Sequence, residues 1–349
     1  MTQSQWETLV RVVKGEPVEP IPVGFIVDSP WLPAWAGMSM LDYFASEEHW
    51  LDAHSKAAET FPDVIFLPGF WSEYGMCTEP SAFGAKCVWY ENDFPFAGKV
   101  LNDIAEARRI TPPDPRTDGL LPFVIARLRH MQQRIRKSGH FIRFAVARGP
   151  LNIASFFMGT TEFLTALRTD PDGVHALLKT ITTFLEDWLQ YQKECFPTID
   201  GILLLDDIVG FCGEDDFREF ALPYLKQAFA AFNASIRFFH NDAEGTVTAR
   251  HCTDIGINLF NFSFQHSIAE MRELTNYQVA LLGNIPPRDI LALGTPNMVR
   301  QAVIDSVRGV SDTRRIILSC GGGMPPDVSS DNIHAFVVGR DALTANPPA

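Results

Sequence analysis

The feature that most constrains this fold is a set of eight short apolar runs that alternate with helical patterns along the chain. Each run is rich in Ile, Val, Leu or Phe, which is typical of strands buried on both faces of a parallel sheet. The runs cover residues 21–27, 63–70, 140–147, 201–208, 235–242, 257–263, 279–285 and 315–321. Such an alternation predicts an α/β fold, namely a (β/α)8 TIM barrel formed by a single domain over residues 1–349.

An open, doubly wound sheet is the alternative architecture. A dinucleotide-binding version of that sheet should carry GxGxxG after its first strand, and this chain has no such motif there. We therefore prefer the barrel, with an N-terminal extension before its first strand. The segment 71–120 is aromatic and rich in turn residues, and it predicts a long loop insertion after the second strand that lies over the barrel mouth.

The charge and the cysteines exclude several classes of protein. A net charge of −13 without a basic block argues against nucleic acid and anionic membranes as partners. The chain has no run of about 18 apolar residues, and its start lacks the apolar segment of a secretory signal. Its six cysteines are scattered without a CxxC pair, which argues against a disulfide scaffold. We expect a cytoplasmic protein that acts on a small molecule.

The strand ends should carry the chemistry, because active sites of (β/α)8 barrels lie at the carboxyl ends of the strands. His240 and Asp242 end the fifth predicted strand and share one of its faces, and Cys320 ends the eighth. Imidazole, carboxylate and thiolate together suit Zn²⁺ with an open fourth position. A hydrogen-bonded His–Asp pair and a small buried cysteine explain the same residues without a metal.

Three further features near the strand ends have two interpretations each. Asp206 and Asp207 are adjacent, so only one should face the barrel mouth, and the other could cap the following helix. Arg148 could hold an anionic substrate or form a buried ion pair. Trp71 could line an apolar pocket or pack in the core.

Several longer motifs resemble one known family. They are GEPVEPIPV near the start, EPSAFGAKCVW, GPLNIASFFMG, FREFALPYLK, LLGNIPPRDILALGTPNMV and CGGGMPPDVSSDNIHAFV. With these motifs the chain resembles the uroporphyrinogen decarboxylase superfamily over nearly its whole length. That superfamily includes the zinc-dependent methylcobamide:coenzyme M methyltransferases and related corrinoid-linked enzymes. The resemblance implies a (β/α)8 barrel, in agreement with the strand count.

The resemblance to the true decarboxylase is incomplete. The arginine-rich motif of that enzyme would fall at VDSPWLPAWAG, which contains no arginine. Its catalytic aspartate would fall near Leu67, its tyrosine matches Phe156, and its histidine falls near Cys320. A substrate with many carboxylates needs cationic partners. We therefore do not expect decarboxylation of a porphyrinogen.

The methyltransferase branch fits better and implies a ligand set. It binds zinc through His-x-Cys and a later Cys, which places His240, Asp242 (where the first cysteine would be) and Cys320 at the metal. The resemblance further implies that His240 and Asp207 are catalytic, and that Asp207 and Glu79 orient the substrate. Arg148, Trp71 and Phe156 complete the predicted substrate site. The implied reaction moves a methyl group between a small thiol or methoxy substrate and a corrinoid on a partner protein, with a homodimer as the family-level assembly.

Two other functions remain open at this stage. One is a metal-free decarboxylase or lyase for a small carboxylic acid, with Arg148 as anchor and Asp207 or His240 as acid or base. The other is a non-catalytic binding protein that has lost its site. The clustering of polar residues at strand ends makes the second of these the weaker hypothesis.

Overall fold

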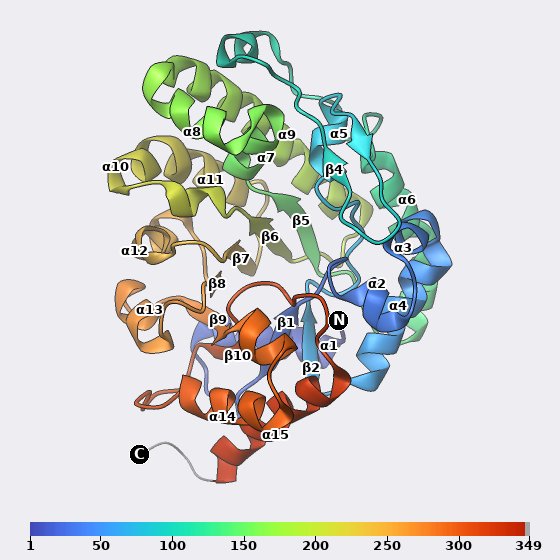
Figure 1. The fold of residues 1–349 in the computed structure, drawn as a ribbon, viewed down its shortest axis with the longest axis vertical. Helices are drawn as coiled ribbons and strands as arrows, with labels where there is room; N and C mark the ends of the chain where they lie inside the picture. Colours follow the sequence, from blue (N-terminus) through green and yellow to red (C-terminus); the bar gives the residue numbers. More distant parts are fainter. Residues whose placement is uncertain (346–349) are drawn as a thin grey trace.

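The computed structural model describes residues 1–345, and in it eight parallel strands form one sheet surrounded by helices (Figure 1). Each strand lies within, or one residue beyond, one of the eight apolar runs, so the predicted barrel is confirmed. The strands are β1 (Val23–Ile26), β2 (Val64–Leu67), β5 (Phe144–Arg148), β6 (Gly201–Leu205), β7 (Ile236–Asn241), β8 (Leu259–Phe262), β9 (Ala280–Ile285) and β10 (Ile316–Cys320).

The strands are ordered around the sheet as β5-β6-β7-β8-β9-β10-β1-β2, which is the cyclic order of a (β/α)8 barrel. Within the described residues, the backbone ladder leaves β2 and β5 as the two ends of the sheet. We call this place the seam. The long insertion departs from the β2 side of the seam.

Helices cover the outside of the sheet, as Figure 1 shows. They are α1 (Gln3–Lys14), α2 (Leu32–Ala36), α3 (Met40–Ala45), α4 (Glu47–Thr60), α5 (Thr78–Ala82), α6 (Leu121–Lys137), α7 (Pro150–Met158), α8 (Thr160–Thr169), α9 (Pro171–Cys195), α10 (Glu214–Asp216), α11 (Leu222–Phe229), α12 (Thr246–Ile255), α13 (Ile268–Leu274), α14 (Pro296–Ser306) and α15 (Ser330–Ala345). No helix in the described part of the chain is both long and apolar enough to cross a membrane.

The two faces of each strand belong to different parts of the core. Alternate residues such as Leu203 and Phe238 pack inside the barrel, whereas Leu204 and Phe239 pack outward against the helices. This period of two is the geometry of any β-strand. It also decides which residues near the end of each strand face the barrel interior.

The predicted N-terminal extension is helix α1, and it lies against the amino-terminal ends of the strands. Its Trp6 ring meets Phe144, the first residue of β5, edge-on at a centroid distance of 5.5 Å. Leu9 and Val12 of the same helix are buried in the inner cluster. The helix begins with a capping box between Thr2 and Gln5.

The segment after β2 is the predicted long insertion, and short helices and strands alternate with its loops. It contains α5, a short antiparallel pair β3 (Cys87–Val88) and β4 (Phe96–Ala97), and a 3₁₀ helix, η1 (Ile104–Arg109). This segment supplies Glu73 and Glu79, which are both buried.

Candidate active site

A cavity of about 450 Å³ opens at the carboxyl ends of the strands. This volume lies in the usual range for small-molecule sites, and the position is the one expected for a (β/α)8 barrel. The cavity is lined by Asp28, Pro30, Met76, Phe94, Arg148, Asn152, Ser155, Phe156, Thr160, Leu205, Asp207, Ile208, His240, Asp242, Gly323, Met324 and Pro325.

Three side chains of this cavity converge on a single point. Asp207, His240 and Asp242 each offer one ligand atom, and these atoms lie within 4.8 Å of one another. His240 Nε2 is 3.6 Å from Asp207 Oδ1 and 4.0 Å from Asp242 Oδ2. The backbone N–H of Asp242 donates to Asp207 Oδ1 at 3.1 Å. These distances are short enough for one divalent cation to contact all three side chains.

Asn261 on β8 determines which nitrogen of His240 faces the cavity. The amide nitrogen of Asn261 donates to the carbonyls of Leu282 and Cys320, at 2.7 and 3.3 Å. Its oxygen is therefore left to accept from His240 Nδ1 at 2.7 Å. In the neutral ring, Nδ1 then carries the proton and Nε2 presents its lone pair toward the two carboxylates. This is the usual arrangement behind a metal-binding histidine.

Cys320 does not join this group in the structure. Ile317 packs inside the barrel, whereas Leu318 and Cys320 pack in the outer cluster against the helices. The Cys320 thiol contacts the carbonyl oxygens of Gly322 and Gly323, at 3.4 and 3.7 Å. Burial raises the pKa of this thiol to about 12. The structure thus brings Asp207, rather than Cys320, to His240 and Asp242.

Arg148 ends β5 and is held by two buried glutamates. Its guanidinium nitrogens lie 3.1 Å from Glu73 Oε2 and 3.2 Å from Glu79 Oε2. Glu79 also accepts from the Arg148 backbone N–H, and Glu73 accepts from the Ser29 hydroxyl. Burial disfavours the charge of Arg148, but Glu79 and Glu73 together raise its pKa. The ion-pair interpretation of Arg148 therefore describes the structure, and Glu79 touches Arg148 rather than the cavity.

Asp28 follows β1 and lines the same cavity. Burial, followed by the nearby charge of Glu73, raises the pKa of its carboxyl well above the ordinary value, and Arg148 offsets part of this effect. Asp28 thus favours its protonated form near neutral pH more than an ordinary aspartate does.

Asp206 and Asp207 point in different directions, as their adjacency predicts. The Asp206 carboxylate accepts from the backbone N–H groups of Leu151 and Asn152 at the start of α7. Burial raises its pKa to about 8. The Asn152 side chain accepts from the backbone N–H of Asp207 at 3.1 Å. Asp206 therefore caps α7, which precedes it in the chain, rather than the helix that follows it, because the end of β6 lies beside the start of α7. Asp207 reaches the cavity from a backbone that Asn152 holds.

The two predicted aromatic wall residues lie in different places. Phe156 on α7 lines the cavity. Trp71 packs inside the barrel with the inner cluster, and its carbonyl accepts from the Trp50 indole at 2.9 Å. Trp71 is not among the cavity residues because the chain after β2 turns it toward the interior.

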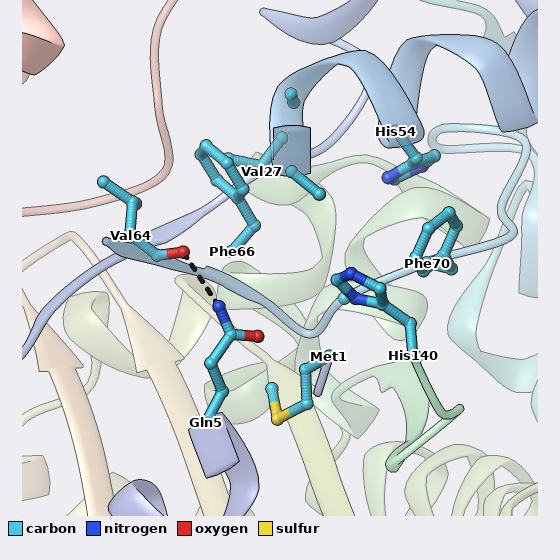
Figure 2. A pocket seen from close by; sticks show the side chains of 11 residues that line it. Met1, Gln5, Val27, His54, Val64, Phe66, Phe70 and His140 are labelled. Atoms are coloured by element: carbon cyan, nitrogen blue, oxygen red, sulfur yellow. Dashed lines mark hydrogen bonds between the residues drawn. The ribbon is translucent and has the colours of Figure 1, made fainter. Parts of the chain in front are cut away.

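A second cavity lies beside β2 and is too small for a substrate (Figure 2). Its volume is about 20 Å³, which is room for about one water molecule. Figure 2 shows Gln5 bonded to the Val64 carbonyl at one side and the rings of His54 and His140 at the other. Burial lowers the pKa of His54 to about 3. This cavity is part of the packing rather than a candidate site.

Two contacts of the site are not assigned from the sequence. Asn261 lies near the end of a predicted strand, and the strand face it shares with Leu259 indicates that it points into the barrel, but not that it contacts His240. The contact of Glu73 with Arg148 joins residues 75 positions apart, and no periodicity in the insertion indicates it. Of the predicted site residues, Asp207, His240, Asp242, Arg148 and Phe156 line the cavity, whereas Glu79, Trp71 and Cys320 do not.

Comparison with known families gives one match that spans the chain. The family model described as Uroporphyrinogen decarboxylase (URO-D) matches residues 4–342. A protein named uroporphyrinogen decarboxylase from Dichelobacter nodosus is 24% identical over 352 residues, which cover 95% of this chain and 96% of the relative. A protein of the same name from Chlorobaculum parvum is 30% identical over 176 residues, which are 48% of each chain.

Two solved structures share the fold. A methyltransferase from Methanosarcina mazei superposes with a TM-score of 0.80 at 19% identity, covering 96% of this chain and 98% of that one. A B12-independent methionine synthase from Shewanella superposes with a TM-score of 0.59 at 11% identity, covering 93% and 98%. At these identities the likeness establishes the barrel architecture.

Proposed function

The chain belongs to the uroporphyrinogen decarboxylase (URO-D) family, and we propose that it is a methyltransferase of this family. In this proposal a methyl group moves between a small thiol or methoxy substrate and a corrinoid on a partner protein. The family-level resemblance found in the sequence is confirmed by the family match. The methyltransferase from Methanosarcina mazei with the same fold supports the choice of reaction.

The observation that carries the proposal is the convergence of Asp207, His240 and Asp242 in the cavity. The lone pair of His240 Nε2 faces two carboxylates, and Asn261 holds the ring in this orientation. One imidazole and two carboxylates form a donor set that fits Zn²⁺ or another divalent metal and leaves a position for substrate. Bound there, the metal would act as a Lewis acid on the sulfur or oxygen of the substrate.

Four further residues position the ligand side chains or form the wall of the site. Asn152 holds the backbone that carries Asp207, and Asn261 keeps the lone pair of His240 available. Phe156 and Met324 form apolar wall, which limits the access of water to the substrate heteroatom. Together these groups bind and orient the substrate before methyl transfer.

The charges of the cavity argue against decarboxylation of a porphyrinogen, although curated relatives carry that name. Among the described residues that line the cavity, Arg148 is the single lysine or arginine, and Glu73 and Glu79 already pair with it. The other acidic residues of the wall are Asp207, Asp242 and Asp28, of which Asp28 favours its protonated form. A substrate with many carboxylates would meet repulsion rather than compensation there.

Metal content tests the proposal first. Protein purified without a histidine tag should bind zinc stoichiometrically, and His240→Ala should lose it. Asp207→Asn and Asp242→Asn should each weaken zinc binding, whereas Cys320→Ser should retain it, because the thiol packs outside the group. If Cys320→Ser loses zinc while Asp207→Asn keeps it, the ligand set implied by the family resemblance is right instead.

Methyl transfer is the second test. Zinc-loaded protein is incubated with methylcobalamin or a methylated corrinoid protein and a panel of thiols, and in the reverse direction with the reduced corrinoid and methoxy compounds. The proposal expects turnover that chelators abolish. The metal-free lyase keeps one supporting observation, namely that Arg148 faces the cavity. Release of CO₂ from a small carboxylic acid in the presence of chelator, with no need for a corrinoid, would favour that function and reject methyl transfer.

A further inference from the structure

A side pocket adjoins the candidate active site. It has a volume of about 280 Å³ and shares Pro30 and Phe94 with the main cavity. Its apolar wall includes Pro33, Met38 and Met40. Because the two spaces share these two lining residues, they lie next to each other, and a substrate bound near His240 would have to pass Phe94 to reach the side pocket.

The side pocket also lacks a partner for an anion. Its charged residues are Asp93 and Asp327, and no lysine or arginine lies among its described lining residues. In the main cavity, Arg148 is neutralised by Glu73 and Glu79. Among the described residues that line the two spaces, no lysine or arginine is then left unpaired, so a metal at Asp207, His240 and Asp242 would be the main source of positive charge, and it can serve one heteroatom of the substrate. A second anionic group on the same substrate would be desolvated without a partner.

The ligands of the proposed metal also indicate whether the substrate atom that binds the metal is oxygen or sulfur. Two carboxylates and one imidazole form a harder site than the thiolate-containing set that the sequence suggests. The Cys320 thiol faces the helices and carbonyl oxygens instead. A hard site favours oxygen over sulfur at the open position.

From these three observations we propose that the substrate is an uncharged methyl ether whose apolar body occupies the side pocket. This inference rests on the proposed methyl transfer and deepens it by naming the substrate class. It excludes small thiols with a sulfonate or carboxylate tail as the preferred substrates. Phe94 and Met38 are then the residues that determine specificity. Phe94 lies between the main cavity and the side pocket, and Met38 lines the side pocket that would hold the apolar body.

Binding measurements with matched probes test the inference. Calorimetry compares 2-methoxyphenol with 4-hydroxy-3-methoxybenzoate, which carries a carboxylate in addition. A second pair compares 2-mercaptoethanol with 2-mercaptoethanesulfonate, which differ by the sulfonate. The uncharged member of each pair should bind about tenfold or more tightly, and 2-methoxyphenol should bind the most tightly of the four. A carboxylated ether that binds as tightly as the neutral one overturns the inference.

Charge-altering variants locate the effect. Met38→Lys places a cation in the side pocket and should raise the affinity for 4-hydroxy-3-methoxybenzoate about tenfold, while the matched Met38→Leu should leave the ratio of the two ethers unchanged. Glu79→Gln removes one counter-charge of Arg148 and should shift the ratio in the same direction. If Met38→Lys folds, as judged by circular dichroism, but leaves the ratio unchanged, the side pocket does not hold the substrate body.

The two proposals fail in different measurements. Binding is measured without a corrinoid, so a preference for 2-methoxyphenol that responds to Met38→Lys supports the substrate class even if no methyl transfer follows. The absence of methyl transfer to a reduced corrinoid would then reject the proposed function alone. Conversely, methyl transfer from a carboxylated ether at the rate of the neutral one would keep the function and reject the substrate class.

Discussion

The two ends of the barrel are built from the same eight strands, yet one end is filled with apolar side chains and the other carries a cluster of polar side chains at a cavity. The change occurs within two residues along the inward face of a strand. Phe238 is followed on that face by His240, and Leu259 by Asn261. At the amino-terminal end, helix α1 adds Trp6 to the apolar cluster.

This difference shows how the molecule stays stable although its candidate site places charged and polar groups in a partly buried position. Buried carboxylates and an imidazole contribute little or negatively to stability unless they are paired. The apolar end buries large side chains and stabilises the fold by the hydrophobic effect. We therefore expect mutations at the amino-terminal end to change stability without changing the site, and mutations at the carboxyl end to do the reverse.

The largest expected effect is at the apolar end. Trp6→Ala removes a 5%-exposed indole that packs on Phe144, so the free energy of unfolding should fall by about 3–5 kcal/mol. Urea denaturation followed by fluorescence measures this change. Zinc affinity of the folded variant should equal that of the wild type. Phe123→Ala, at a 59%-exposed position on α6, is the control and should change stability by about 0.5 kcal/mol or less.

The matching change at the polar end removes the partner of His240. Asn261→Leu deprives Nδ1 of its acceptor, so the ring loses the preference that directs the lone pair of Nε2 into the cavity. Zinc affinity, measured by competition with a chromogenic chelator, should fall about 10–100-fold. Ser263→Ala, two residues further along, leaves the His240 contact intact and serves as the control. Unchanged zinc affinity in Asn261→Leu would reject the role assigned to Asn261.

The third prediction concerns pH and a buried histidine that does not line the candidate active site. Burial lowers the pKa of His54 from 6.5 to about 3, so the unfolded chain binds this proton and the folded chain does not. Stability should therefore fall as pH falls from about 6.5 toward 3, by about 1.4 kcal/mol per pH unit for this one group. His54→Gln should show a shallower slope than the wild type in urea titrations at several pH values. The exposed Phe123→Ala removes no titratable group and should keep the wild-type slope.

The smallest expected effect again lies at the apolar end. Thr2 caps α1, and its hydroxyl accepts from the Gln5 backbone N–H at 3.2 Å. Thr2→Ala should lower the free energy of unfolding by about 1 kcal/mol, because one N–H of the first turn loses its partner. Thr2→Ser keeps the hydroxyl and should behave like the wild type. Equal destabilisation by both substitutions would mean that the cap contributes nothing.

The barrel is predictable from the sequence because it depends on local patterns. Each strand is a short apolar run, and the alternation with helices leaves few topologies. The same alternation explains which of the predicted site residues lie together in the structure and which do not. His240 and Asp242 share a strand face, and both reach the cavity. Cys320 is one residue out of phase with Ile317 and Ser319, so its place on the outer face could have been inferred from RIILSC.

The insertion could not be predicted in the same way. The sequence of the insertion has no hydrophobic periodicity that indicates how it packs against the sheet. Its buried charged groups also pair with residues that are distant in the sequence. Glu73 and Glu79 meet Arg148 from positions 75 and 69 residues away. The charge of the cavity therefore depends on tertiary contacts that no local pattern encodes.

The position of Arg148 has one further consequence. It ends β5 at one side of the seam, while Glu73 follows β2 at the other side, where the backbone ladder does not join the two strands. The Arg148–Glu73 ion pair thus connects the two edges of the sheet at the barrel mouth, where the described part of the sheet has no backbone hydrogen bonds that join them. A lineage that exchanged this arginine to alter its ligand preference would also weaken the connection between these two edges. Changes of charge at this corner are therefore expected to arise in compensating pairs.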